Sequence, residues 1–165
     1  MRCGNDFLAE RANDGLLFRM RIYLDMCCLQ RPMDDQAHFR IHMETEAILG
    51  VLAWCEAGNA QLLSSVALRY EIDHNPHPVR KAFAQETLSK SAVSIPASSA
   101  AAQRARRYAA SGIKALDALH LACAVEANAD YFCTCDDRFL RRAKLASTAT
   151  TRAVSPSELI EILDP

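Results

Sequence analysis

Four acidic residues lie where predicted strands end or within predicted helices: Asp25, Glu71, Asp117 and Asp136. Carboxylates that converge repel one another, and a divalent cation is the usual relief. Oxygen ligands suit hard ions such as Mg²⁺ and Mn²⁺, which activate water and stabilise the charge of a phosphoryl displacement. These residue types therefore predict a metal-dependent phosphodiesterase or phosphatase, and spacing alone does not choose between them.

Each of the four residues also has a structural interpretation. Asp25 and Asp136 are suited to capping a turn or a helix. Asp117 complements the dipole of a helix N-terminus, and Glu71 suits a solvated helix face. Asp117 is the hardest to explain in this way, because a carboxylate buried between apolar neighbours is costly unless it is paired or binds a cation. The set of four is therefore a stronger indication than any member.

The elements that must position these side chains alternate between strands and helices. Short apolar runs predict strands at 22–24, 61–64, 92–95, 131–134 and 150–154. Helical patterns occupy 35–57, 66–73, 79–89, 98–110, 115–127, 137–146 and 156–163. This alternation predicts one α/β domain over residues 20–165 with a mainly parallel sheet. Since ligands of such sheets bind outside the carboxyl ends of the strands, we expect the four carboxylates near one edge.

Four segments carry a more specific pattern: Ile22-Tyr23-Leu24-Asp25, Ser65-Val66-Ala67-Leu68-Arg69-Tyr70-Glu71, Leu116-Asp117-Ala118-Leu119-His120-Leu121-Ala122 and Thr134-Cys135-Asp136-Asp137-Arg138-Phe139. Together they resemble the motifs of PIN-domain proteins, the fold of the VapC-type toxin ribonucleases. The third segment is the most specific match, because it is close to the family's Asp-Ala-Leu-His-Leu-Ala stretch. The resemblance spans about residues 20–163.

The resemblance implies a three-layer α/β/α sandwich with a five-stranded, mainly parallel sheet. It implies an endoribonuclease that binds Mg²⁺ or Mn²⁺ and whose catalytic and metal-binding residues are Asp25, Glu71, Asp117 and Asp136. Thr134 occupies the hydroxyl position beside the last of these, where we expect it to contact substrate. The implied partners are an RNA substrate, a cognate antitoxin protein and a second copy of the chain.

The chain departs from the family pattern in two places. Met26-Cys27-Cys28 follows Asp25, where the family usually has Thr or Ser and then Asn or Ser. A lost hydroxyl there weakens orientation of the first carboxylate, and a catalytically weak PIN-fold module that binds nucleic acid or regulates a partner is therefore the alternative function. Asp137 leaves two candidates for the fourth ligand. A phosphatase of the haloacid dehalogenase type also has an Asp after its first strand, but it needs a second Asp at the position of Cys27. The sequence therefore disfavours that class of enzyme.

The formal net charge of −1 excludes a protein that grips nucleic acid by overall positive charge. Local basic clusters remain: Arg138, Arg141, Arg142 and Lys144, and separately Arg104, Arg106 and Arg107. Charge runs are often solvated faces, but the first cluster begins beside the expected metal site, where phosphate must arrive. We therefore expect Arg138 and Arg141 to bind substrate.

Seven cysteines, an odd number in apolar contexts, predict reduced thiols in a cytoplasmic protein. Cys133 and Cys135 are expected on one side of a strand, and Cys27-Cys28 ends the neighbouring strand. Because the Cys-x-x-Cys spacing of zinc sites is absent, these are interpreted as small core thiols. His120, on the face of Asp117, is interpreted as a core histidine or as a partner of the carboxylates.

The N-terminal residues 1–19 lack the apolar core of a signal peptide, and no run approaches the ~20 apolar residues that span a membrane. The first strand-like run begins only at Met20. We therefore expect residues 1–19 to be a tail or the product of a mis-called start codon, and we expect no membrane partner.

Overall fold

Strand β1 (Met20–Leu24) lies at the centre of the sheet, because its apolar residues are covered on both faces. In the computed structural model, which describes residues 19–163, the side chains of Ile22, Tyr23 and Leu24 are 0% exposed. A short apolar run without alternation is typical of a strand in a parallel sheet. The sequence therefore places its most buried strand directly before Asp25.

The sheet has five strands in the order β3-β2-β1-β4-β5. The other strands are β2 (Ala60–Ser65), β3 (Val93–Ile95), β4 (Tyr131–Cys133) and β5 (Arg152–Val154). Every neighbouring pair is parallel, which confirms the predicted parallel sheet and places all carboxyl ends at one edge.

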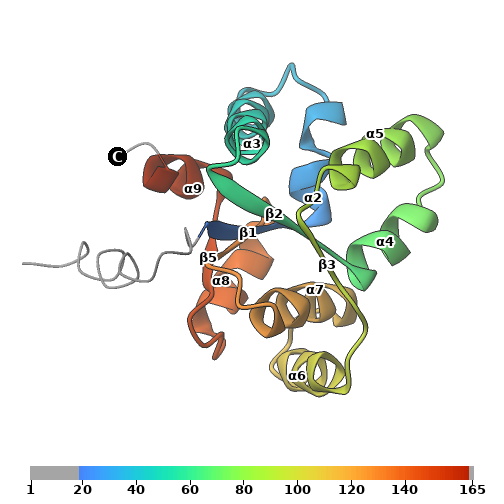
Figure 1. Cartoon of the computed structure of the whole chain (residues 1–165), viewed down its shortest axis with the longest axis vertical. Coiled ribbons are helices and arrows are strands. Elements are labelled where there is room, and N and C mark those ends of the chain that lie inside the picture. Colours follow the sequence, from blue (N-terminus) through green and yellow to red (C-terminus); the bar gives the residue numbers. More distant parts are fainter. Residues whose placement is uncertain (1–18, 164–165) are drawn as a thin grey trace, which may run out of the picture.

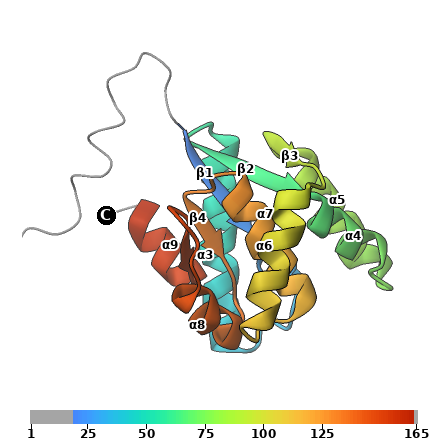
Figure 2. The same ribbon diagram turned by 90° about the horizontal axis from the view of Figure 1, so that it is seen from below.

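Helices cover both faces of the sheet, so that the described residues form the expected α/β/α sandwich (Figure 1). One layer contains α3 (Phe39–Glu56), α5 (Pro78–Ser89) and α9 (Pro156–Leu163). The other contains α6 (Ser99–Ala110), α7 (Ala115–Glu126) and α8 (Asp137–Leu145). Figure 2 shows the same layers seen from below. Within residues 19–163, no helix combines the length and apolar character that crossing a membrane requires.

The remaining helices lie next to the carboxyl ends of the strands. α4 (Val66–Asp73) follows β2 without a break, and Ser65 caps it by accepting a hydrogen bond from the backbone N–H of Leu68. α2 (Met26–Leu29) and the 3₁₀ helix η1 (Arg31–Met33) follow β1. The elements expected from the sequence include no helix at residues 26–33, although Pro32 suits the first turn of a short helix.

The largest difference from the predicted elements is the start of α3, which begins at Phe39 and not near residue 35. The side chain of Asp35 accepts a hydrogen bond from the backbone N–H of Ala37, and this local turn competes with helix at residues 34–38. The expected N-terminal tail lies outside the described residues, apart from Arg19.

Candidate active site

The carboxyl ends of β1 and β4 meet where the strand order reverses. The chain passes from β1 to β2 and β3 on one side and then returns to β4 on the other side of β1. Leu24 pairs with Cys133, and the backbone N–H of Asp25 donates to the carbonyl of Cys133 at 2.9 Å. Such a switch point is where open α/β sheets bind ligands. The segments after these two strands therefore define the candidate site.

The carboxylate of Asp25 is buried at this point and accepts three hydrogen bonds. Its Oδ1 accepts from the backbone N–H of Met26 at 2.8 Å, which caps α2. Its Oδ2 accepts from the Thr134 hydroxyl at 3.0 Å and from the Cys27 thiol at 3.3 Å. Burial, and then the neighbouring Cys27, raise the pKa of Asp25 well above its usual range. Asp25 is thus both the predicted cap and a carboxylate that a nearby cation would strongly favour.

Thr134 and Cys27 are the groups that orient Asp25. Thr134 is fully buried, and its hydroxyl also accepts a hydrogen bond from the backbone N–H of Asp136 at 3.2 Å. This placement favours a positioning role over the direct substrate contact that the sequence predicted. The Cys27 thiol donates to Asp25 in a segment where this chain lacks the hydroxyl residue of the family pattern. This donor was not predicted from the sequence.

Glu71 on α4 is held in place by a buried chain of hydrogen bonds. The His120 Nε2–H donates to Glu71 Oε2 across 2.7 Å, and the His120 Nδ1 lies 2.8 Å from the Tyr23 hydroxyl. The same hydroxyl lies 2.7 Å from Ser65 Oγ, at the N-cap of α4. The residues that fix Glu71 therefore come from the central strand, the neighbouring strand and α7.

The imidazole of His120 is buried beside Glu71, within the candidate site. Burial alone lowers its pKa, but the hydrogen bond to Glu71 and the charges of Asp25 and Asp117 outweigh burial, so that the pKa is raised. Three of the four predicted carboxylates thus act on one side chain that is 1% exposed. His120 is both the satisfied buried histidine and the partner of a carboxylate, the two interpretations that the sequence left open.

Asp117 lies half-buried in the first turn of α7. No group among residues 19–163 donates a hydrogen bond to its carboxylate within bonding distance. Burial raises its pKa most, and the charges of Asp136 and Glu71 raise it further, whereas Lys114 and His120 act in the opposite direction. A carboxylate in this position is stabilised by an approaching cation.

Asp136 and Asp137 have different surroundings, which bears on the choice between them. The Asp136 Oδ1 accepts from the backbone N–H groups of Arg138 and Phe139, both at 2.9 Å, and so caps α8. Both oxygens of Asp137 are engaged by the guanidinium of Arg40 at 2.7 Å, and this hydrogen-bonded pair lowers the pKa of Asp137. Asp136 acts electrostatically on Asp117, and its Oδ2 accepts no hydrogen bond from residues 19–163.

The four carboxylates lie at one end of the sheet, but they do not converge on one position. Within residues 19–163, no three carboxylate residues have an oxygen each within 4.8 Å of the other two. Like charges repel, and Mg²⁺ usually keeps several waters and binds through one or two carboxylates. The oxygen-only donor set and the unpartnered Asp117 therefore fit a hydrated divalent cation.

The two arginines predicted to bind substrate differ from their basic neighbours. The side chains of Arg138 and Arg141 are exposed, and neither makes an ion pair with a described residue. Arg142 donates to the carbonyl of Ser111 at 3.1 Å, and Lys144 pairs with Glu158 at 2.6 Å. Arg138 and Arg141 thus keep their charge available at the start of α8.

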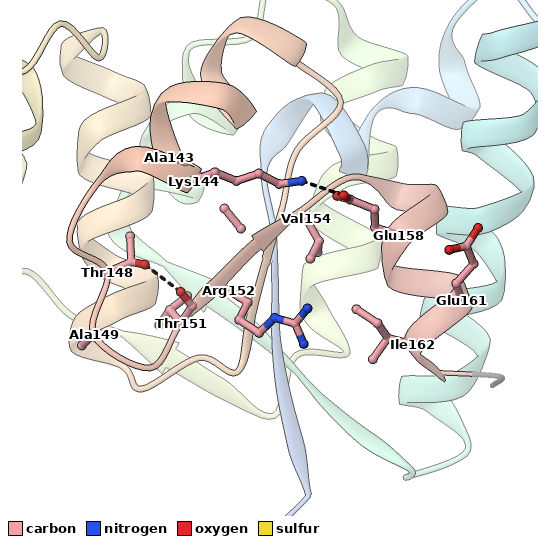
Figure 3. A pocket seen from close by; sticks show the side chains of 11 residues that line it. Ala143, Lys144, Thr148, Ala149, Thr151, Arg152, Val154, Glu158, Glu161 and Ile162 are labelled. Atoms are coloured by element: carbon pink, nitrogen blue, oxygen red, sulfur yellow. Dashed lines mark hydrogen bonds and ion pairs between the residues drawn. The ribbon is translucent and has the colours of Figure 1, made fainter. Parts of the chain in front are cut away.

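A hollow of about 700 Å³ lies elsewhere, between the end of α8, β5 and α9 (Figure 3). Figure 3 shows the Lys144–Glu158 pair and the Thr148–Thr151 hydrogen bond at its wall, with the Arg152 side chain reaching into it. None of the four predicted carboxylates lines this hollow. The hollow is therefore separate from the candidate site.

Comparison with known proteins agrees with this geometry. The family model described as PIN domain matches residues 22–145, a range that includes all four carboxylates. The fold is similar to a chain in the crystal structure of VapBC2 from Rickettsia felis bound to a DNA fragment from its promoter, with a TM-score of 0.55 and 14% identity. That alignment covers 82% of this chain and 98% of the other. No curated protein matches this chain in sequence.

Proposed function

Because the chain belongs to the PIN-domain family, we propose that it is an endoribonuclease that hydrolyses RNA with Mg²⁺ or Mn²⁺. PIN domains are generally nucleases, and such nucleases typically use divalent metal ions. The observation that carries the proposal is the half-buried Asp117 carboxylate, which has no donor among residues 19–163 and whose pKa Asp136 and Glu71 help to raise.

Asp25, Asp117 and Asp136 would hold the cation, and Glu71 would be a further ligand or would position a water. When bound, the cation supplies an activated water and stabilises the charge that develops on the phosphoryl group. Thr134 and Cys27 keep Asp25 oriented through their hydrogen bonds to its Oδ2. His120 keeps Glu71 fixed and offsets negative charge when protonated. Arg138 and Arg141 bind the phosphates of the RNA strand.

We further propose an antitoxin protein as partner. The similar structure is of a VapBC2 complex, and in this chain α3 carries exposed apolar side chains at spacings of four and eleven residues, which share one helix face: Phe39, Met43 and Trp54. A protein partner would cover this face. Light scattering of the purified chain, with and without the protein encoded by the adjacent gene, tests the proposal. If the chain is a monomer and does not bind the protein encoded by the adjacent gene, this result contradicts both the antitoxin partner and the expected homodimer.

Six cysteines among the described residues are free thiols, which is compatible with a reducing compartment, and the proposed site of action is the cytoplasm.

The test of catalysis is cleavage of a labelled single-stranded RNA by the full chain. We expect cleavage with Mn²⁺, none with EDTA, and a loss of at least about 100-fold in Asp117→Asn, since this variant removes a direct ligand. Asp73→Asn, an exposed acid on the same helix as Glu71, is the matched control and keeps full activity. Cleavage that survives EDTA or Asp117→Asn would contradict the proposal.

A calorimetric titration with Mn²⁺ separates the enzyme from the alternative function. The proposed enzyme binds Mn²⁺, and Asp117→Asn abolishes this binding. RNA binding without cleavage and without measurable Mn²⁺ binding would identify the catalytically weak binding module instead.

A further inference from the structure

Three cysteines form a second cluster of potential metal ligands beside Asp25. Cys27 and Cys28 lie on α2 after β1, and Cys135 follows β4. The Sγ atoms of all three lie within 4.8 Å of one another, and those of Cys28 and Cys135 are 3.4 Å apart. Cys28 and Cys135 are buried, whereas Cys27 is partly exposed. We propose that these three thiols bind one soft divalent cation of the Zn²⁺ type.

The distances agree with a single ion. Zn–S bonds are about 2.3 Å long, so two thiolates on one Zn²⁺ lie at most about 4.6 Å apart and about 3.8 Å apart in tetrahedral geometry. The Cys28–Cys135 distance of 3.4 Å is slightly shorter than this value, and no Sγ–Sγ distance in the cluster exceeds 4.8 Å. The Sγ atom of Cys133 lies 3.8 Å from that of Cys28, but it does not lie within 4.8 Å of all three Sγ atoms of the cluster. Cys133 is therefore not part of the ligand set.

The surroundings of the three cysteines favour the deprotonated thiolate, which is the form that binds a metal ion. The backbone N–H of Cys135 donates to Cys27 Sγ at 3.2 Å. The positive charge of Arg31 lowers the pKa of Cys135, and ion pairs to Asp34 at 3.0 Å and Glu44 at 2.9 Å fix the position of this guanidinium. N–H groups that hold ligand sulfur are a typical support of metal sites. Core thiols that only fill space need no such donors.

Charge and ligand type select the ion. Thiolates favour Zn²⁺ and similar soft ions, whereas carboxylate oxygens favour Mg²⁺ and Mn²⁺. Three thiolates with a divalent cation leave one negative charge, whereas three thiolates with a monovalent ion leave two. The partly exposed Cys27 gives the ion a route from solvent and leaves a fourth position for water.

The thiol site adjoins the carboxylate site through one contact. The Cys27 thiol donates to Asp25 Oδ2 at 3.3 Å, and a cation on Cys27 replaces the proton of that thiol. Asp25 then loses one of its three donors. Binding of a soft cation is therefore expected to lower Mn²⁺ affinity, although the existence of the thiol site does not depend on the proposed nuclease activity.

The test uses Cd²⁺ alone as the probe, added to the reduced, metal-free full chain. We expect one Cd²⁺ per chain, with the ultraviolet charge-transfer absorption of cadmium thiolates. We also expect bound Cd²⁺ to protect Cys27, Cys28 and Cys135 from alkylation, measured by peptide mass. Cys135→Ser and Cys27→Ser weaken binding by more than the 10–100-fold that loss of a supporting partner costs.

One matched variant is expected to bind Cd²⁺ as the unmodified chain does. Cys55→Ser removes a partly exposed thiol of α3 outside the cluster. Asp117→Asn is also expected to leave Cd²⁺ binding unchanged, which separates this site from the proposed Mn²⁺ site. Circular dichroism verifies folding, and if Cys135→Ser fails to fold, the partly exposed Cys27→Ser carries the test.

Three results would overturn the proposal. The first is a reduced chain that binds no Cd²⁺, and the second is Cd²⁺ binding that persists in a folded Cys27→Ser variant. The third is a Cys28–Cys135 disulfide in air-exposed protein together with unprotected thiols in the reduced protein. That result would indicate that these two sulfur atoms lie close together because they form a disulfide and not because they bind a metal ion.

Discussion

Two groups of potential metal ligands adjoin each other at the carboxyl ends of β1 and β4, and they differ in how closely their ligand atoms approach one another. The carboxylate group draws on four separated segments, and within residues 19–163 no three carboxylate residues have an oxygen each within 4.8 Å of the other two. The thiol group draws on two segments and lies within that distance. Like charges keep the carboxylates apart, whereas polarisable thiols pack together in the core.

The contrast indicates how one sheet edge can distinguish two classes of cation. Ligand type sets the preference, because carboxylate oxygens suit hydrated Mg²⁺ and Mn²⁺ whereas thiolates suit soft ions. The contact between Asp25 and Cys27 is the boundary between the two groups. Variants on either side of this boundary therefore separate the two sites.

The largest expected effect is that of Asp25→Asn. This change removes the charge of the most buried carboxylate, so we expect Mn²⁺-dependent cleavage to fall at least about 100-fold. Cd²⁺ stoichiometry is expected to stay at one, since the three thiols remain. Calorimetry with each ion measures both. Loss of the two ions together would show that the groups form one site.

The second prediction concerns pH. At a fixed, subsaturating Mn²⁺ concentration, cleavage should rise with pH through the range above the ordinary Asp pKa, by up to about tenfold per pH unit. The reason is that Asp25 and Asp117 have raised pKa values and bind the cation only when ionised. Saturating Mn²⁺ should move the profile to lower pH. A profile that is flat from pH 5 to 8, about the range above the ordinary Asp value, would contradict the assignment.

Stability of the metal-free protein should change with pH in the opposite direction. A carboxyl group whose folded pKa exceeds its unfolded value binds more protons when folded. Its stabilising contribution is present below the unfolded pKa and is lost as pH rises through the folded pKa. Thermal melts across the acidic range test the sign, and Asp117→Asn should make the metal-free protein less sensitive to pH.

The third prediction tests whether His120 serves the carboxylate group. His120→Gln should lower kcat about tenfold with little change in KM, because Glu71 loses its anchor. It should also lower stability by roughly 1–3 kcal/mol, since buried polar groups lose a partner. Tyr23→Phe is the matched control, because it disturbs the other imidazole nitrogen and leaves the contact with Glu71. Equal activity losses in the two variants would assign His120 a purely structural role.

The smallest effects are expected for the exposed arginines. Arg138→Gln and Arg141→Gln should each raise KM for RNA a few-fold and reduce the dependence of log affinity on log salt by about 0.7. Neither should alter binding of Mn²⁺ or Cd²⁺. Lys144→Gln removes a charge that Glu158 already neutralises, and its effect on KM should be smaller. An equal effect of all three would indicate a diffuse electrostatic contribution.

The sequence predicted the sheet and most helices because their signals are local and strong. The strand expected at 22–24 and the helices expected at 115–127 and 156–163 are present as β1, α7 and α9. The short α2 and η1 were missed because a four-residue helix has no periodicity to detect. Their formation depends on the side chain of Asp25 and on Pro32.

Predictions for the candidate site were limited by residue pairs distant in sequence. Nothing in the order of residues indicates that Thr134 donates to Asp25, or that His120 joins Glu71 to Tyr23. The thiol group was dismissed because zinc motifs were sought as one contiguous spacing, whereas Cys28 and Cys135 are 107 residues apart. The carboxylates were predictable because a motif marks each of them separately.

The pairing of β1 with β4 also sets the order of events during synthesis. Asp25 and its Thr134 donor are separated by 109 residues, so the bond between them cannot form until the ribosome has released most of the chain. Such non-local pairing is also slow to form, since a long loop must close first. A growing chain therefore carries Asp25 without its Thr134 donor until β4 and Thr134 have been synthesised, and the proposed cleavage activity begins only after that point.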